Sequence, residues 1–343
     1  MISACGAIIP YGTIVNKCFD VIIFRLLTYN IIMVNAVKGQ VLQELRRSGS
    51  LVSGQALSRK LGISRVSVWK HVNSLKADGY DIAASSQGYR LISSPDLLLP
   101  CEFPRLKRKL YHFYQVDSTM NVARRLARQG AEAGTIVVAE SQMGGRGRLD
   151  RTWISPKEGI YLTIILRPAI SAVHAPRINL MAAVAVARVI RALFGVMAVL
   201  KWPNDVLVGE KKICGILAEM EAEIDAVHYV NVGIGLNVNA SVAREEENAT
   251  SLKEELSRQV SRKEILISVV GEIDRQQALL TGDGLLEQWR ALNTTLGKDV
   301  KIVMLGGEIR GKALDIDTDG ALVVRDREGS LHRILAGDCI YLR

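Results

Sequence analysis

A glycine- and arginine-rich segment follows a short apolar stretch near the middle of the chain. Thr135–Ala139 is predicted to be a buried strand, and Glu140–Arg148, with the sequence ESQMGGRGR, would leave its end as a loop. Glycines permit close backbone approach and unusual dihedral angles, and guanidinium groups match the geometry of phosphate oxygens. The residues concerned are Gly144, Gly145, Gly147, Arg146, Arg148 and Arg151. The pattern predicts a phosphate-binding loop, and a flexible basic loop without a ligand is the alternative.

This loop matches neither of the two most familiar nucleotide-binding patterns. The chain shows no GxxxxGK[ST] sequence of a Walker loop at this point, and no GxGxxG sequence that opens a helix. The nature of the ligand therefore depends on what accompanies the loop.

A second motif, Lys201–Asp205 with the sequence KWPND, follows the predicted strand Ala198–Leu200. A lysine at a strand end, beside a conformationally fixed proline, is held at a definite position. It can place a positive charge between a substrate carboxylate and an α-phosphate. A lone lysine is normally a solvated surface group, so this interpretation depends on the arginine loop.

Two further strands are predicted after this motif. Lys212–Glu219 has the sequence KICGILAE, and Val230–Gly235 runs into the sequence GIGLN at residues 233–237. Gly233 and Gly235 could mark β-bulges, or they could let a flat ring lie against the backbone.

Composition limits the classes of protein to which the chain can belong. Apolar residues make up 48% and charged residues 23% of its 343 residues, which is ordinary for a soluble globular protein. The formal charge of +9 favours contact with polyanions. The five scattered cysteines form no CxxC pair, which favours a reducing cytoplasm and predicts neither a disulfide framework nor a structural metal site.

The chain divides into a leader and three predicted domains. Residues 1–35 lack both an uninterrupted apolar span of about 20 residues and a basic region before a cleavage site, so we expect no membrane association and treat them as disordered or as upstream of the true start, with Met33 a plausible initiator. Residues 36–96 are predicted to be a winged helix-turn-helix domain, 104–296 an α/β domain with a mixed sheet, and 297–343 a small β-barrel.

The first domain has the pattern of a DNA-binding helix-turn-helix. Val41, Leu42 and Leu45 predict a first helix. Ser53 is expected to cap a second helix, in which Ala56, Leu57 and Leu61 face inward, and Gly62 provides the turn. Ser64 is expected to cap a third helix whose core face is Val68, Val72 and Leu75, with Ile63 packed on Val68. The segment from Gly79 to Leu91 would form a wing.

The outward face of the third helix is predicted to enter the major groove. Residues 36–96 contain nine basic and four acidic residues, a net charge of +5, which suits the displacement of counterions from phosphates. Trp69 is expected to be a partly buried anchor. A packing or dimerisation domain with a basic face is the alternative. The candidate DNA-contacting residues are Ser64, Arg65, Ser67, Lys70, His71 and Asn73.

The last segment alternates apolar and polar residues between tight turns. Turns are predicted at Gly306-Gly307, Asp319-Gly320 and Glu328-Gly329. They separate strands at Val300–Met304, Ile309–Ile316, Ala321–Arg325, Leu331–Leu335 and Cys339–Leu342. This pattern is typical of a small β-barrel similar to a Src-homology-3 domain.

Taken in order, the motifs Asp117-Ser118-Thr119, GGRGR, KWPND, KxxGIL and GxGxN resemble those of biotin protein ligases. With the preceding helix-turn-helix, the chain resembles the bifunctional, BirA-type branch of that family over nearly everything after residue 36. The resemblance implies a class II synthetase-like catalytic domain, the substrates biotin and ATP with Mg²⁺, and two partners: a biotin carboxyl carrier protein and operator DNA bound by a homodimer.

The resemblance also assigns roles to individual residues. It implies that Ser118 and Thr119 hold the biotin ureido ring, with Met120 and Gln142 beside it, that Gly145, Arg146, Gly147 and Arg148 contact biotin and the adenylate phosphate, and that Arg151 stabilises the nucleotide. Lys201 would bind the biotin carboxylate and α-phosphate and, with Arg146 and Arg148, carry the catalysis. Asn204, Lys212 and Asn237 would serve ATP or magnesium, and Gly233 and Gly235 would border the ligand. No residue is assigned as a metal ligand.

The chain departs from the family pattern at two places. Met120 stands where asparagine is common after Ser-Thr, and Asn121 comes one position later. Leu149-Asp150 replaces a basic residue and glycine, which lowers the cationic strength of the loop. A DNA-binding sensor without ligase activity and a lipoate-type ligase remain alternative interpretations.

Overall fold

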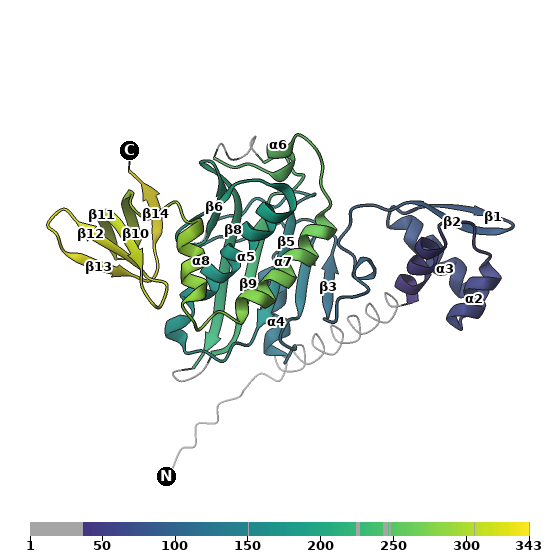
Figure 1. Cartoon of the computed structure of the whole chain (residues 1–343). Helices are drawn as coiled ribbons and strands as arrows, with labels where there is room; N and C mark the ends of the chain where they lie inside the picture. Colours follow the sequence, from purple (N-terminus) through teal and green to yellow (C-terminus); the bar gives the residue numbers. More distant parts are fainter. Residues whose placement is uncertain are drawn as a thin grey trace, which may run out of the picture. The chain divides into compact units, whose positions relative to one another are not determined.

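The computed structural model describes residues 37–149, 151–223, 227–242, 246, 248–304 and 306–342. The predicted leader therefore lies outside the described residues. The chain forms two compact units: one contains the described residues up to Pro95 together with Pro100–Pro104, and the other contains Asp96–Leu99 and the chain from Arg105 onward (Figure 1).

The first unit has the predicted helix-turn-helix architecture. A helix over residues 37–48 is followed by α2 (Gly54–Leu61), α3 (Arg65–Ala77), the antiparallel pair β1 (Asp81–Ser85) and β2 (Gly88–Ser93), and the 3-10 turn η1 (Pro100–Glu102). Val68, Val72 and Leu75 of α3 are buried, as predicted.

The helix caps of this unit are also as predicted. The Ser53 side chain accepts a hydrogen bond from the N–H of Ala56, and that of Ser64 accepts one from Ser67. Gly62 ends α2 in the left-handed conformation, with φ of 65°. One expectation was wrong: Ala56 is exposed rather than buried. Trp69 was expected to be partly buried and is 55% exposed. Local caps set where helices begin, but burial also depends on what packs across from them.

The second unit is built on a seven-stranded mixed sheet in the order β3-β4-β5-β9-β8-β7-β6. Only β3 and β4 pair in parallel; the other neighbours are antiparallel. The strands are β3 (Leu110–Phe113), β4 (Ile136–Ala139), β5 (Ile160–Leu166), β6 (Ala198–Lys201), β7 (Asp205–Val208), β8 (Lys211–Ala222) and β9 (Val227–Leu236). Every residue of β4 and β5 is buried, which explains why these strands show no alternation of polar and apolar residues.

Helices cover this sheet and enclose its core. α5 packs on β6, β7, β8 and β9 and is itself contacted by α7 and α8, while α4 packs on β4, β5 and β9 (Figure 1). The helices are α4 (Thr119–Arg128), α5 (Pro176–Phe194), α6 (Leu252–Leu256), α7 (Arg262–Gln277) and α8 (Gly284–Leu292), with a 3-10 turn η2 (Ala172–His174). None of the described helices is long and apolar enough to span a membrane.

The C-terminal strands form a five-stranded antiparallel sheet in the order β13-β12-β11-β10-β14. They are β10 (Asp299–Met304), β11 (Gly307–Ile316), β12 (Leu322–Asp326), β13 (Leu331–Ile334) and β14 (Asp338–Tyr341), close to the predicted strands. Among the described residues no ladder joins the edge strands β13 and β14, so the pairings define a sheet with two edges rather than a closed barrel.

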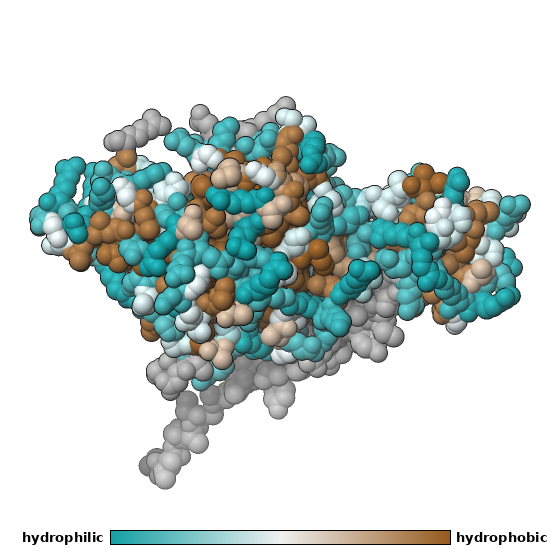
Figure 2. Space-filling view, in the orientation of Figure 1, coloured by the Kyte–Doolittle hydropathy of each residue, from teal (hydrophilic) through white to brown (hydrophobic). Residues whose placement is uncertain are grey.

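On the face shown in Figure 2, hydrophilic residues predominate and apolar residues lie in smaller patches between them. Cys101, Cys214 and Cys339 are buried and free, as expected for cysteines that act as small apolar residues.

Candidate active site and nucleic-acid interface

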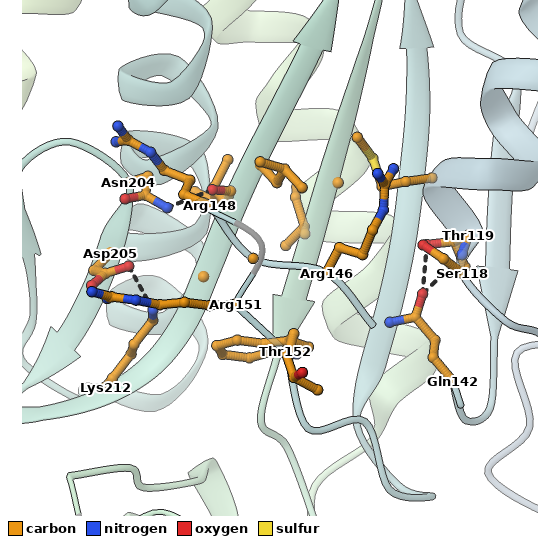
Figure 3. A pocket seen from close by; sticks show the side chains of 18 of the residues that line it. Ser118, Thr119, Gln142, Arg146, Arg148, Arg151, Thr152, Asn204, Asp205 and Lys212 are labelled. Atoms are coloured by element: carbon orange, nitrogen blue, oxygen red, sulfur yellow. Dashed lines mark hydrogen bonds and ion pairs between the residues drawn. The ribbon is translucent and has the colours of Figure 1, made fainter. Parts of the chain in front are cut away.

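A cavity of about 140 Å³ brings together residues from all the central motifs. It is lined by the start of β7, by β8 and β9, by the start of α4 and by the arginine loop. Eleven predicted ligand-binding residues line it: Ser118, Thr119, Met120, Gln142, Arg146, Gly147, Arg148, Arg151, Asn204, Lys212 and Gly233. Segments more than 100 residues apart thus meet at one place (Figure 3).

One end of the cavity is a chain of hydrogen-bonding side chains. The Gln142 Oε1 accepts hydrogen bonds from the Thr119 N–H and hydroxyl, at 2.8 and 3.1 Å, and its Nε2 donates to Ser155 Oγ at 2.9 Å. Thr163 Oγ1 donates to Thr119 Oγ1 at 2.9 Å. Ser118 Oγ is buried and has no protein partner among the described residues. A buried hydroxyl without a partner is costly, which fits a ligand that hydrogen-bonds here.

The arginine loop is folded as a small hairpin rather than left open. Trp153 N donates to Gly145 O at 2.8 Å and Gly147 N to Arg151 O at 2.7 Å, with Arg146 paired to Thr152. Its glycines do not have positive φ angles; Leu149 does, at 51°. The expectation of unusual glycine dihedrals was therefore wrong.

Close approach, in contrast, is confirmed for two of the three glycines. A Cβ on Gly144 would lie 2.3 Å from Asp117 Oδ1, and one on Gly145 would lie 2.3 Å from Trp153 O, whereas Gly147 leaves ordinary contact distances.

The other end of the cavity is strongly charged. Arg148 is half-buried, and burial lowers the pKa of its guanidinium group. Arg146 Nη2 lies 3.0 Å from Glu219 Oε1, Lys212 Nζ lies 2.8 Å from Asp205 Oδ1, and Arg151 pairs with Asp338. The three cations in these pairs are therefore already neutralised by carboxylates in the free protein.

The indole of Trp153 lies flat against the central strands. Gly215 and Gly235 face each other across β8 and β9, and a Cβ on either would lie 2.9 or 2.3 Å from the indole. The ladder is regular at Gly233 and Gly235, and its irregularity lies at Glu221–Ala222. The interpretation of Gly233 and Gly235 as β-bulges was therefore wrong. A flat ring does lie against the backbone at Gly235, and it is the indole of Trp153.

Four predicted site residues do not line the cavity. Gly145 and Gly235 pack against Trp153, which lines the cavity, and so contribute to its wall indirectly. Asn237 Nδ2 donates to Thr250 O at 3.0 Å. The Lys201 ammonium lies over the ring of Tyr341, 4.8 Å from its centroid. Conversely, Trp153, Asp205 and Asp338 line the cavity but were not among the predicted residues. Asp205 belongs to the KWPND motif and could have been included, whereas nothing near Asp338 in the sequence indicated it.

The packing of the Trp153 indole on Gly235 can be tested by adding a methyl group at position 235. Gly235→Ala is expected to destabilise the fold by about 1–3 kcal/mol, because the added methyl group overpacks against Trp153. Urea denaturation measures this change. Gly271→Ala in α7 is the control: apart from its chain neighbours and the backbone of its own helix, nothing lies within 4 Å of its Cβ position, so alanine there should stabilise the helix by roughly 0.5–1 kcal/mol. A neutral Gly235→Ala would show that the indole does not occupy this position.

The first unit presents a polar helix face. Ser64, Arg65, Lys70 and Asn73 are exposed on or just before α3, while Ser67 and His71 are half-buried. Burial, followed by the charge of Lys38, lowers the pKa of His71. The face is thus cationic through Arg65 and Lys70, as a groove-binding helix requires.

Comparison with known proteins gives the same division of the chain. Residues 38–90 match the helix-turn-helix domain model, 112–237 the biotin/lipoate A/B protein ligase family and 295–342 the biotin protein ligase C-terminal domain. The bifunctional ligase/repressor BirA of Bacillus spizizenii is 35% identical over 89% of this chain and 99% of its own length, and that of Escherichia coli is 27% identical over 86% and 94%.

Solved structures agree with this result. The biotin protein ligase from Aquifex aeolicus in complex with biotin and ATP is 30% identical, covers 68% of this chain and 99% of its own, and has a TM-score of 0.59. The fold and cavity therefore define a biotin/lipoate-type protein ligase domain joined to a helix-turn-helix domain. The chain belongs to the family of bifunctional BirA ligase/repressors.

Proposed function

We propose that the chain is an ATP-dependent biotin protein ligase that also represses transcription of biotin-synthesis genes. In the first step, the biotin carboxylate attacks the α-phosphorus of ATP, and the bond to the β-phosphate breaks to release pyrophosphate. In the second step, a lysine amine of a biotin carboxyl carrier protein, as in acetyl-CoA carboxylase, attacks the carbonyl of biotinyl-5'-AMP and expels AMP. The observation that carries this proposal is one cavity with a hydrogen-bonding end and a cationic end.

The hydrogen-bonding end fits the ureido ring of biotin. Ser118 offers a hydroxyl that has no hydrogen-bond partner in the described part of the chain, and Gln142 and Thr119 are fixed by each other. Met120 borders this end: its Sδ lies 2.7 Å from the position of a Cβ on Gly233, so a side chain at 233 would displace it. Met120 therefore replaces the usual asparagine with an apolar wall, and Asn121 instead donates to Asp117 Oδ2 at 2.7 Å.

The cationic end fits the phosphate groups. Biotin carboxylate and ATP are both anionic, so their approach is opposed electrostatically. We assign Arg146, Gly147 and Arg148 to the adenylate phosphate, and Arg151, Asn204 and Lys212 to the nucleotide, where fixed donors offset charge that develops in the transition state. Gly145, Gly235 and Asn237 act through the walls of the cavity. We assign Lys201, which ends β6 beside the lining residue Asp205, to the biotin carboxylate and the α-phosphate.

Magnesium is part of the proposal as the ion that accompanies ATP. The described residues contain no cluster of three metal-ligating side chains, but Mg²⁺ held by phosphates needs only one or two protein carboxylates. Asp205 and Asp338 line the charged end and provide such oxygens. Bound Mg²⁺ would neutralise part of the phosphate charge.

The test of ligase activity is transfer of labelled biotin to a carrier protein whose acceptor lysine is known. We expect ATP-dependent labelling of that lysine and none of its arginine variant. The specific alternative is a lipoate ligase, because the matched family model covers both classes. Preferential transfer of lipoate when biotin and lipoate compete would favour that alternative. If neither biotin nor lipoate is transferred, the remaining interpretation is a DNA-binding sensor without ligase activity.

DNA binding is expected to depend on α3. The double variant Arg65→Ala/Lys70→Ala should lower operator affinity and reduce the slope of log K against log [salt] by about 0.9 for each phosphate that the protein no longer neutralises. A gel-shift salt series measures it. Lys76→Ala, also exposed but in the last turn of the same helix, is the control. An unchanged slope in the double variant would exclude phosphate binding by these residues.

We further propose that repression involves a homodimer, because a two-fold operator matches a two-fold protein. We also propose that the protein is cytoplasmic, and its buried free cysteines Cys101, Cys214 and Cys339 agree with a reducing compartment. Sedimentation with and without biotin and ATP tests the oligomeric state.

A further inference from the structure

Two ammonium groups lie over one aromatic ring beside the charged end of the cavity. Lys201 Nζ is 4.8 Å and Lys298 Nζ is 4.0 Å from the centroid of the Tyr341 ring. Lys201 ends β6 in the central sheet, whereas Lys298 precedes β10 and Tyr341 ends β14 in the C-terminal sheet. Cation–π attraction of this kind stabilises a cation but does not neutralise its charge.

The ring is held in place by the segment that carries Lys201. Tyr341 Oη is 3.1 Å from Thr295 Oγ1, and the same hydroxyl oxygen of Thr295 accepts a hydrogen bond from Trp202 N at 3.0 Å. Trp202 follows Lys201 and is fully buried, and its Nε1 donates to Gly320 O at 3.2 Å. The Tyr341 ring is therefore tied to the backbone beside Lys201, and it is the fixed group on which both ammonium groups lie.

This pair of lysines adjoins the cavity. Lys201 is paired across β6 and β7 with Asp205, which lines the charged end. The buried thiol of Cys339 lies within electrostatic reach of both lysines and of Asp205 and Asp338: burial raises its pKa to about 12, the lysines oppose that rise and the two carboxylates add to it. Asp338 also lines the cavity.

Neither lysine has an acidic partner among the described residues. Among the described residues, no carboxylate lies within 4 Å of Lys201 or Lys298 Nζ; the polar partner of Lys298 Nζ is Thr294 Oγ1 at 3.1 Å. This differs from Arg146, Arg151 and Lys212, which are all ion-paired. Two like charges on one ring repel each other, so an anion that contacts both would be favoured.

We infer that Lys298, acting with Lys201, binds the β- and γ-phosphates of ATP and the pyrophosphate that leaves in the first step. The inference rests on the proposed function and extends it by a residue of the C-terminal sheet. Lys201 adjoins the cavity through its ladder partner Asp205, and Lys298 adds a second ammonium group from the C-terminal sheet at the same Tyr341 ring. When the bond between the α-phosphorus and the bridging oxygen breaks, the electron pair stays on pyrophosphate, and the charge that grows there faces both ammonium groups.

The two half-reactions separate this role from a general effect on the enzyme. Biotinyl-5'-AMP lacks the β- and γ-phosphates, so its reaction with the carrier lysine does not require a pyrophosphate site. The reversal of the first step, in which biotinyl-5'-AMP reacts with inorganic pyrophosphate to regenerate ATP and biotin, does require a pyrophosphate site. We therefore expect Lys298→Ala to raise the KM for pyrophosphate in the reverse reaction, and for ATP in the forward reaction, about tenfold, as when about 1.4 kcal/mol of binding is lost, while transfer from preformed biotinyl-5'-AMP stays unchanged.

Two variants complete the experiment on the full chain. Lys298→Arg retains the charge and should restore most of the affinity for pyrophosphate. Lys301→Ala removes a lysine of neighbouring β10 that is 3.7 Å from Glu308, and it should leave both KM values unchanged. The inference is overturned if Lys298→Ala leaves the KM for pyrophosphate unchanged, or if it slows transfer from biotinyl-5'-AMP as much as reversal. If the unaltered protein forms no biotinyl-5'-AMP at all, the proposed function fails first and the inference falls with it.

Discussion

Arg148→Ala is expected to lower the rate of biotin-dependent exchange of pyrophosphate into ATP by about 10²–10³-fold, the usual effect of removing one preorganised donor from a developing negative charge. Arg148 is half-buried at the charged end of the cavity and, unlike its neighbours Arg146 and Arg151, has no ion-pair partner within 4 Å among the described residues. It is therefore available to an incoming phosphate without giving up a carboxylate. Isotope exchange at saturating biotin measures the change.

The matched control is Arg128→Ala, an exposed arginine of α4 that pairs with Glu221 outside this cavity. It should retain normal exchange, and both variants should unfold at the same temperature as the unaltered protein. Lys201→Ala is expected to lose adenylate formation as Arg148→Ala does. Normal exchange in both Arg148→Ala and Lys201→Ala would refute the assignment of this cavity as the adenylation site.

The largest effect on stability is expected at Glu140, one residue after β4. Its Oε2 lies 2.8 Å from Arg262 Nη1, and its Oε1 accepts hydrogen bonds from Leu98 N at 2.9 Å and contacts His112 Nε2 at 2.9 Å. The side chains of Glu140 and Arg262 are 5% and 4% exposed. Glu140→Gln should lower the free energy of unfolding by about 3–5 kcal/mol, because Arg262 loses its buried carboxylate partner and keeps only Asp96, whose side chain is 35% exposed.

Denaturant titration at several pH values tests this expectation. Burial alone would raise the pKa of Glu140, but His112, Arg262 and the Leu98 N–H together hold it below its usual value. The contribution of Glu140 is therefore complete above the pKa of glutamate in the unfolded chain and is lost as the pH falls through the lower pKa of the folded protein. The difference between Glu140→Gln and the unaltered protein should shrink over that range.

Glu132→Gln is the control for this variant. It removes a carboxylate that is 76% exposed and pairs with Lys109, so it should change stability by less than about 1 kcal/mol at any pH. A cost at Glu140 no larger than that at Glu132 would contradict the prediction.

The features that the sequence predicted correctly are those that a few neighbouring residues decide. Ser53 and Ser64 cap their helices because a side-chain oxygen reaches an N–H three residues later. Gly62 ends its helix because it adopts a positive φ at little cost. The strand before the arginine loop was likewise evident from its unbroken apolar run.

The features that the sequence did not predict arise from contacts between distant segments. Nothing near Trp153 indicates that its indole rests on Gly215 and Gly235, and nothing near Asp338 indicates that it lines the same cavity. The position of Lys201 depends on Tyr341, far along the chain in the last strand. Such pairings are set by how the two sheets pack together, and sequence periodicity carries no record of them.

The ion pairs of Arg146, Arg151 and Lys212 have a consequence for selectivity. Each of these cations is already matched by a carboxylate of the same chain, so a passing anion gains little by entering: it must replace an existing partner. Inorganic phosphate or sulfate makes no further contacts to offset the loss of that ion pair. A ligand that also places a ring at the hydrogen-bonding end of the cavity does. We therefore expect simple anions to compete poorly for these three side chains, and the cations without a carboxylate partner to be the ones that a small anion reaches first.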